Sequence, residues 1–490
     1  MKKTLSILFF YFIVLLNFQT MALNPNVIVR GTAVNGAGKV VDLYGYTDRL
    51  TFSEKLLDSD EIKADQSFEL KMFVNYPTLI FIQIENYSQS FFVEPGRTYE
   101  LYIRRFDWDL DEHRNVFLQP EPLPVEFLNV PSNELNVAIG RIESVIDSFV
   151  YENVAHFDYK FKPDHKYFDT LAQLVNKIVP DGDNNFQNRY KRYRLATLRY
   201  DLRFATRKKM FDSYVSGQQI MYYDENFMDF FFNLFQSSVS RGNKYVLMSD
   251  MVRWVNSGDL TTMLDSLGLD PLLRNEQIRE LVALQALKES YDIRGYDRDA
   301  VVKMVELLGG RSKFPEHVKL ANNLVLNFKN MEVGAEVPEF ELPDVDKNYV
   351  SMNDFKGKWI YLSFVRVGDP NSLREIETLA HFKDSIYAKS DNVVFITVAC
   401  DREFQKMYHF LKNNKKGKAY NWTWLHFNGN FKLLEKYEVV NYPTFLLINP
   451  DGKLQYNVTP TPASGFLLSP PWQPNVDKSV QRGLWLRNGR

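Results

Sequence analysis

The hydrophobic pattern of this 490-residue chain changes twice along its length, and the changes divide it into three parts. Between about residues 25 and 105, short runs of β-branched and aromatic residues are separated by turn signals such as Pro95-Gly96, which predicts a small β-sandwich. From residue 132 to about 329 the apolar residues recur at helical spacing. From about Val333, strand-like and helix-like patterns alternate. The sequence therefore predicts a multidomain α+β protein.

The expected boundaries follow from these changes. We expect a signal peptide over residues 1–22, a β-sandwich module over 23–105, a mainly helical region over 106–330 and a further domain over 331–490. Residues from about 106 to 130 are Pro-spaced and irregular, which indicates a linker. The first helix is predicted from an apolar stripe with Ser132 as its N-cap, and the stripe consists of Leu135, Ile139, Ile142, Ile146 and Phe149. Further helices are expected at about 165–179, 184–208, 224–239, 273–291, 297–309 and 315–329.

The first 22 residues have the pattern of a secretory signal. Lys2 and Lys3 form a positive start, Leu5 to Leu16 are apolar, and Thr20-Met21-Ala22 offer small residues near a cleavage point. We expect cleavage and export to the periplasm or cell envelope, with an uncleaved anchor as the alternative. The signal contains no cysteine, so a lipid anchor is not expected, and no later segment has the pattern of a transmembrane helix.

Charge and composition give no indication of a nucleic-acid partner. The net charge is −2, and the basic, aromatic stretch "RYKRYRLATLRYDLRFATRKK" is interpreted as a helix that packs Tyr193, Ala196, Tyr200 and Phe204 inward, rather than as an anionic-surface patch. Phe227 to Phe235 is interpreted as a core helix rather than as a ligand pocket. The seven histidines are scattered without metal-ligand spacing, so we expect no structural metal and no other cofactor.

Cys400 is the only cysteine in the chain. No intramolecular disulfide can form, although disulfides would persist in an oxidising compartment. The fold must therefore be stabilised by packing alone.

The last part of the chain has the pattern of strand, helix, strand and then an antiparallel hairpin. Buried strands are predicted at Trp359 to Val365 and at 391–400, and an Asp451-Gly452 turn is predicted to join two more strands. Helices are expected at Ser372 to Ser390, Arg402 to Asn413 and about 430–437. This order predicts an α/β sandwich with a mixed central sheet.

Several short motifs occur in this part in a familiar order. They are Gly334, Pro338 and Phe340 in the entry segment, "FKGK" at 355–358, Glu375 on the following helix, "VACD" at 398–401, "VNYPT" at 440–444 and "NPDG" at 449–452. Together they resemble the exported thioredoxin-like family of TlpA/ResA-type thiol–disulfide oxidoreductases, which is related to the AhpC/TSA antioxidant group. The resemblance covers about 130 residues. The β-rich front part also resembles the small sandwich modules that precede such domains.

The resemblance implies a thioredoxin-like domain in which Asp369-Pro370-Asn371-Ser372 stand where the family has Cys-x-x-Cys. It also implies a cis Tyr442-Pro443 bond beside a peptide-binding groove. Disulfide exchange requires a thiolate and a resolving thiol, which Asp369 and Ser372 cannot supply. We expect instead that one of these two side chains caps the following helix.

Three functions remain open from the sequence. The leading hypothesis is a non-redox binding or scaffold protein with a residual peptide groove at Tyr442 and Pro443, whose partner is another exported or envelope protein. The alternative is a thiol–disulfide oxidoreductase or antioxidant-type enzyme that uses the lone thiol of Cys400 with an external reductant. A third hypothesis is a structural subunit of an envelope assembly. Hydrolysis by Ser372 has no support, because no histidine and acid accompany it recognisably.

Overall fold

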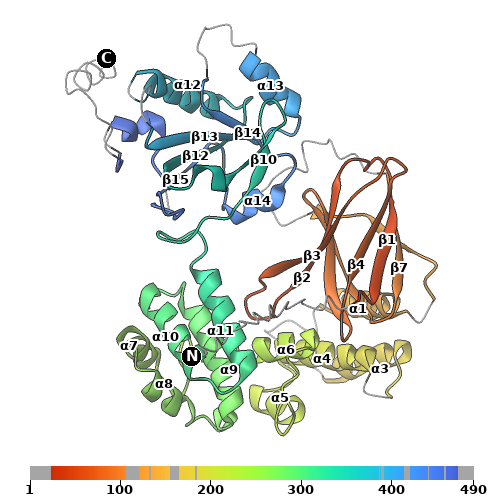
Figure 1. The fold of residues 1–490 in the computed structure, drawn as a ribbon. Coiled ribbons are helices and arrows are strands. Elements are labelled where there is room, and N and C mark those ends of the chain that lie inside the picture. Colours follow the sequence, from red (N-terminus) through yellow and green to blue (C-terminus); the bar gives the residue numbers. More distant parts are fainter. Residues whose placement is uncertain are drawn as a thin grey trace, which may run out of the picture.

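A computed structural model of the chain describes residues 24–105, 121–131, 134–154, 165–182, 185–385, 387, 391–412, 420–439, 441–456, 459–468 and 470–472. The signal peptide expected over 1–22, Ser132 as an N-cap and Val440 of the "VNYPT" motif lie outside the described residues. Three structural parts follow one another along the chain, a β-sandwich, a helical region and an α/β domain (Figure 1). The α+β fold class is therefore confirmed.

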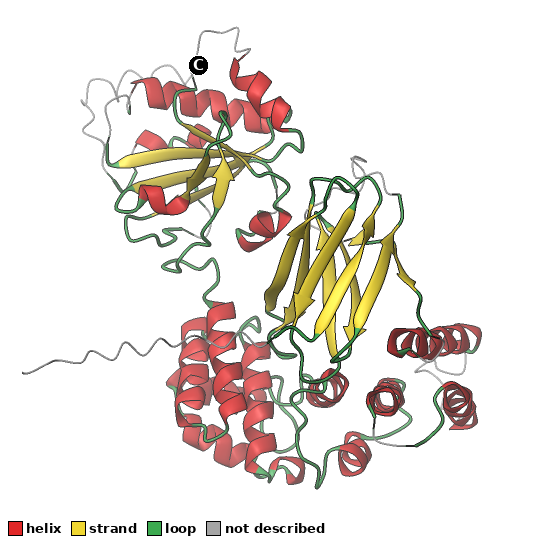
Figure 2. Ribbon diagram, turned by 45° about the vertical axis from the view of Figure 1, so that its right-hand side comes forward, coloured by secondary structure: helices red, strands yellow, loops and turns green. Residues whose placement is uncertain are grey.

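The first part consists of two facing β-sheets (Figure 2). One sheet has the strand order β4-β1-β7-β9 and the other β3-β2-β5-β6-β8. Their inward residues form one core that includes Val29, Leu43, Phe68 and Ile82, as expected for aligned sheet packing. The strands are β1 Val27–Ala33, β2 Val40–Tyr46, β3 Glu54–Glu61, β4 Ser67–Met72, β5 Thr78–Ile84, β6 Tyr87–Val93, β7 Thr98–Ile103, β8 Glu121–Pro122 and β9 Val125–Leu128.

The sandwich extends beyond the boundary at 105 that the sequence predicted. Strand β9 pairs antiparallel with β7, and β8 pairs with β6, so part of the expected linker belongs to the two sheets. The Pro-rich spacing of this segment hides the alternation of a strand, and β8 has only two residues, one of them Pro122.

The middle part is helical. Its helices are α1 Leu135–Glu152, α3 His165–Ile178, α4 Phe186–Asp201, α5 Arg207–Tyr214, α6 Glu225–Phe235, α7 Met248–Ser257, α8 Leu260–Leu267, α9 Glu276–Ser290, α10 Arg298–Arg311 and α11 Pro315–Phe328, with the short 3-10 turn η2 at Pro271–Leu273. Glu134, rather than a serine, caps α1 by accepting a hydrogen bond from the backbone N–H of Val137. Three helices, α5, α7 and α8, were not predicted.

The helix predicted over 184–208 ends earlier than expected. It stops after Asp201, where Leu202 ends α4 and Arg203 adopts a positive φ of 59°, and α5, a separate helix that extends beyond the predicted range, starts after the Thr206 cap. The inward face was predicted correctly for Tyr193, Ala196 and Phe204, which are buried.

The arginines of α4 are not simply solvated, because several of them form ion pairs. Arg189 pairs with Asp224 and Arg194 with Glu143.

The side chains of α6 confirm the prediction that Phe227 to Phe235 form a core helix. Phe227, Phe230, Phe231 and Phe235 all belong to the main helical core.

The last part is an α/β domain with a four-stranded mixed sheet of order β14-β13-β12-β15. Strands β12, β13 and β14 are parallel, and β15 is antiparallel to β12. The helix α12 begins two residues earlier than predicted and ends at Ser385. The elements are β10 Glu341–Pro343, β11 Tyr349–Ser351, the 3-10 turn η3 Met352–Phe355, β12 Trp359–Val365, α12 Pro370–Ser385, β13 Val393–Ala399, α13 Phe404–Lys412, β14 Thr423–His426, α14 Phe431–Lys436, β15 Thr444–Ile448 and the 3-10 turns η4 Pro462–Ser464 and η5 Phe466–Leu468.

Two details of this domain differ from the prediction. The short strand β14 was not expected, and the strand predicted to return after Asp451-Gly452 is reduced to single bridges at Lys453 and Leu454. The segment that follows turns away into η4 and η5, where Leu467 and Trp472 cover the sheet face that also carries Tyr361. None of the described helices is both long and apolar enough to span a bilayer.

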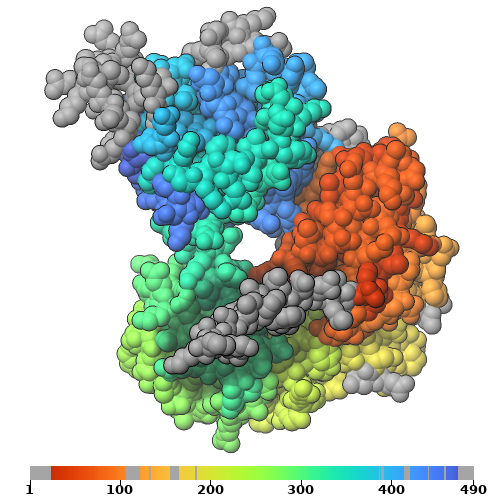
Figure 3. Space-filling view, viewed as in Figure 1, coloured from red at the N-terminus to blue at the C-terminus, as the bar shows by residue number. Residues whose placement is uncertain are grey.

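The sandwich contacts both other parts of the chain. Its β2–β3 turn enters the helical region, where Arg49 forms a bidentate ion pair with Asp229 of α6. On the other side, Glu54 pairs with Lys432 of α14. The space-filling view shows the α/β domain resting against the sandwich, with an opening between these two parts and the helical region (Figure 3).

Candidate functional site

The candidate site lies at the edge of the mixed sheet where the parallel strands β12 and β13 end. Val365 is paired with Ala399 at this end, so the segments that follow, Arg366 to Asp369 and Cys400 to Asp401, emerge side by side. A backbone hydrogen bond from the N–H of Cys400 to the carbonyl of Val365 (2.7 Å) ties the two ends together. The loop before β15 reaches the same edge, because Thr444 is paired with Phe364.

Asp369 is the N-cap of α12. One of its carboxylate oxygens accepts a hydrogen bond from the backbone N–H of Ser372 at 2.7 Å, and Pro370 occupies the first helical position. The negative charge lies at the positive end of the helix dipole, which favours it. The predicted capping role is therefore confirmed for Asp369.

Ser372 is fully buried, with 0% of its surface exposed. Its hydroxyl oxygen accepts a hydrogen bond from the backbone N–H of Arg366 at 3.3 Å and so links the helix to the end of β12. Both residues that the resemblance places at the family's two cysteine positions thus hold the turn in place. Neither carries a group that can form or resolve a disulfide.

Cys400 lies in the same region but is shielded from solvent. Only 3% of its surface is exposed, and it packs into an apolar cluster with Phe364, Leu425 and Tyr437. Its thiol is directed to the carbonyl of Val398 at 3.5 Å. Burial raises the pKa of the Cys400 thiol well above its ordinary value, because the thiolate would be desolvated. The geometry is that of a small apolar core side chain.

Tyr442 and Pro443 border the site from the β15 side. Their peptide bond is cis, as the resemblance implied. The Arg366 guanidinium lies over the Tyr442 ring at 4.8 Å, a cation–π contact across the two segments. The Tyr442 hydroxyl is buried next to the Cys400 thiol without meeting the geometry of a hydrogen bond. Burial raises the pKa of this hydroxyl.

Asp401 and His426 complete the site, and sequence reasoning assigned no role to either. The Asp401 carboxylate accepts a hydrogen bond from the backbone N–H of Val367 at 2.7 Å. The His426 ring contacts the Asp401 carbonyl through Nε2 (2.6 Å), while its Nδ1 accepts from the N–H of Asn428 (3.1 Å). Nε2 therefore carries the proton, and burial lowers the pKa of His426, so the ring is a neutral donor.

These two residues position the loop and do no evident chemistry. Burial raises the pKa of Asp401, while its hydrogen bond to Val367 opposes this shift. The available sequence signal was that Asp401 directly follows the strand-end motif "VAC" and that His426 ends a neighbouring parallel strand. Among the described residues, no group of three or more His, Cys, Asp or Glu side chains is placed to bind a metal ion.

The neighbouring sandwich touches the same edge. Arg402, the next residue after Asp401, forms an ion pair with Glu85 of the β5–β6 turn at 3.4 Å. Glu85 also pairs with Lys39. The loop after β13 is thus held from both its own domain and the sandwich.

The strand order, the parallel crossover and the cis-proline loop together define a thioredoxin-like fold, and residues 357–454 match the family model described as thioredoxin-like. The chain thus carries a thioredoxin-like domain at its C-terminus. Its relatives include the thiol-disulfide oxidoreductase ResA of Bacillus subtilis (strain 168), which is 26% identical over 142 residues, covering 27% of this chain and 70% of that protein.

Two solved structures that match part of the chain are also thiol-disulfide oxidoreductases by description. A crystal structure assigned as a thiol-disulfide oxidoreductase from Bacteroides vulgatus is 25% identical and matches with a TM-score of 0.26, over 28% of this chain and 92% of that chain. A crystal structure of the thioredoxin domain of a thiol-disulfide oxidoreductase from Bacteroides vulgatus is 25% identical, with a TM-score of 0.23, over 26% of this chain and 86% of that chain. Both matches cover about a quarter of this chain.

Proposed function

We propose that this protein is an exported thioredoxin-fold protein that binds another exported or envelope protein and carries out no dithiol chemistry. The observation that carries the proposal is that Asp369 and Ser372, at the positions where the resemblance implies two reactive cysteines, have structural roles. Asp369 caps α12, Ser372 ties the helix to β12, and no second cysteine exists in the chain. The export component rests on the signal-like pattern of residues 1–22.

The single-thiol enzyme is less well supported than the binding protein. A reactive cysteine needs a stabilised thiolate and access for its substrate. Cys400 is almost fully buried, and burial raises its thiol pKa. The Arg366 guanidinium, whose charge favours the thiolate, lies over the Tyr442 ring, and burial outweighs its effect on the pKa of the thiol.

The surface beside Asp369 is suited to contact a partner. Gly368, Pro370 and Asn371 are exposed at the start of α12, and Asn441 is exposed on the facing loop. The backbone beneath them is fixed by the hydrogen bonds described above, so a partner would meet a rigid surface at little ordering cost. This rigid edge, rather than a nucleophile, is what the fold presents.

A blocking variant tests this function. Purified wild-type protein and a variant with Asn371→Arg and Asn441→Arg are used to capture cross-linked partners from the envelope fraction. The control is Asn353→Arg, an exposed asparagine in η3, which precedes β12 and so lies at the opposite end of that strand. We expect a partner that is captured by wild type and by the control and is lost with the blocking variant. Capture that is equal for all three proteins would contradict binding through this edge.

A further inference from the structure

A crevice separates the sandwich turn from the helical region, and Arg49 divides it into two cavities. Arg49 donates through Nε and Nη2 to the two carboxylate oxygens of Asp229, at 2.8 and 2.5 Å. One cavity of about 400 Å³ is bounded by α6 and α9, and the other, of about 330 Å³, by α4, α6 and β5. Both are lined by Arg49 and Asp229.

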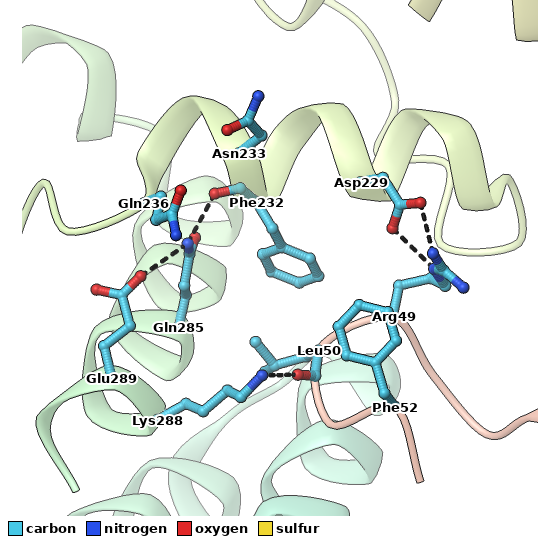
Figure 4. Close-up of a pocket in the computed structure, with 10 residues that line it drawn as sticks. All are labelled: Arg49, Leu50, Phe52, Asp229, Phe232, Asn233, Gln236, Gln285, Lys288 and Glu289. Atoms are coloured by element: carbon cyan, nitrogen blue, oxygen red, sulfur yellow. Dashed lines mark hydrogen bonds and ion pairs between the residues drawn. The ribbon is translucent and has the colours of Figure 1, made fainter. Parts of the chain in front are cut away.

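The polar groups of the α9 cavity are mostly committed to partners (Figure 4). The Lys288 ammonium donates to the carbonyl of Leu50 at 2.5 Å, and the Gln285 amide donates to the carbonyl of Phe232. The Glu289 carboxylate accepts from the N–H of Ser237 and from Gln285. Apart from Arg49, which lines both cavities, the described residues of this cavity leave only the side-chain oxygen of Gln285 buried without a hydrogen-bond partner.

The α4 cavity is different, because three of its lining residues each carry a buried polar atom that has no hydrogen-bond partner among the described residues. These atoms are Nη1 of Arg49, Oε2 of Glu225 and Nδ2 of Asn226. Nη1 and Oε2 form an ion pair at 3.8 Å, a distance too long for a hydrogen bond. The Arg49 and Glu225 side chains are only 14% and 16% exposed. The other carboxylate oxygen of Glu225 accepts from the N–H of Leu79 at 2.8 Å, which fixes its orientation. Apolar walls come from Leu79, Phe92 and the tyrosines Tyr190 and Tyr193.

The charges in this cavity favour a neutral ligand. Above about pH 7, where Glu225 is ionised, Arg49 and Arg194 are matched by Glu225 and Asp229, all of which line the wall. An anion that approached Nη1 of Arg49 would also meet Oε2 of Glu225, only 3.8 Å away, and a cation would meet the guanidinium. The Arg194 guanidinium is already bound to Glu143.

The 3.8 Å distance between Nη1 of Arg49 and Oε2 of Glu225 favours a hydroxyl group as the ligand atom between them. One oxygen can lie within hydrogen-bonding distance of two atoms that are 3.8 Å apart, accept from the guanidinium and donate to the carboxylate. A trans peptide group presents its C=O and N–H in opposite directions and cannot serve both atoms. Asn226 offers a second donor for a neighbouring hydroxyl. We propose that this cavity binds a neutral polyhydroxylated ligand of monosaccharide size, with its apolar ring face against the aromatic wall.

The test uses the full-length protein at pH 8, where Glu225 is ionised, and saturation-transfer NMR with D-glucose, N-acetyl-D-glucosamine and, as an amide probe, acetamide. We expect saturation transfer from the wild-type protein to at least one of the two sugars. Asn226→Leu should weaken binding about tenfold, as should Glu225→Gln, which turns the acceptor facing Arg49 into a second donor. The controls are Asn233→Leu, at a residue of the same helix that lines the other cavity, and Glu341→Gln, at an exposed glutamate of the α/β domain.

Three outcomes would overturn the proposal. They are the absence of saturation transfer to both sugars, equal binding by wild type and the two cavity variants, and saturation transfer to acetamide alone. The first would leave water as the occupant of the cavity, and the last would assign the three atoms to a carboxamide. Thermal unfolding of each variant distinguishes a loss of binding from a loss of the fold.

Discussion

Asp369 and Ser372 are joined by a hydrogen bond from the Ser372 backbone N–H to the Asp369 carboxylate, at 2.7 Å. The sequence resemblance places the family's two thiols at these positions. Here the two residues supply a helix cap and a buried hydroxyl, which keep the turn in place without a thiol. The same hydrogen bond gives the first prediction.

Replacing the cap should destabilise the domain. Asp369→Ala removes the acceptor for the N–H of Ser372, and removal of an N-cap costs about 1 kcal/mol. Asp369→Asn keeps an acceptor oxygen and should cost less. The free energy of unfolding of the α/β domain, measured by urea denaturation, checks this. A loss that is equal for both variants would show that the charge, and not the cap, matters.

Cys400 should resist alkylation in the folded protein. Its thiol is buried, and burial raises its pKa, so the thiolate that reacts with iodoacetamide is scarce. We expect slow labelling at pH 8 that becomes fast in denaturant, followed by mass spectrometry. Labelling of the native protein at the rate of a free thiol would support the alternative hypothesis of an enzyme that uses the Cys400 thiol.

Glu225 gives a prediction about pH. Burial raises its pKa from the ordinary 4.5 to about 7, so the folded chain keeps a proton that the unfolded chain loses between these values. The stability of the wild-type protein should therefore fall as pH rises through this window. The stability of the Glu225→Gln variant should not fall in this window, because glutamine does not titrate.

The difference in unfolding free energy between Glu225→Gln and wild type should grow from pH 4.5 to 7 and then level off. At about 1.4 kcal/mol per pKa unit, its upper limit is about 3 kcal/mol. Calorimetry across this pH range, with Glu341→Gln as the exposed control, measures the difference. A difference that does not change with pH would mean that Glu225 is ionised in the fold without cost.

A buried network in the helical region provides a stability test. His317 is 0% exposed, its Nδ1 contacts the Glu280 carboxylate at 2.9 Å, and its Nε2 contacts the Tyr222 hydroxyl at 2.6 Å. His317→Ala should cost about 3 kcal/mol, because Glu280 and Tyr222 would each be deprived of a buried hydrogen-bond partner. His381→Ala, at an exposed histidine of α12, should change the unfolding free energy little. Similar values for the two variants, from denaturant titrations, would show that the network is dispensable.

The fold was predictable from the sequence where the pattern was local and long enough. The strand at Trp359–Val365 matches its predicted bounds, because its residues form a continuous apolar run after a clear turn. The strand at Thr423–His426 was missed, since four residues do not establish a period. The helix at Met248–Ser257 was also missed, and its start has no side-chain cap that would mark it.

The site was predictable only in its local contacts. The Asp369 cap joins residues three positions apart, and a cap of this kind can be recognised from the sequence. The contacts of Asp401 with Val367 and His426 depend on which strands are neighbours in the sheet, which residue types do not reveal. The pairing of Arg49 with Asp229 joins residues 180 positions apart and could not be anticipated from any local pattern.

The proposed absence of dithiol chemistry is tested most directly by insulin reduction. The purified mature protein is assayed with dithiothreitol, beside Cys400→Ala and a buffer blank. We predict that the wild-type protein and Cys400→Ala both precipitate insulin no faster than the blank. Faster turnover by the wild-type protein, whether or not it depends on Cys400, would contradict the account.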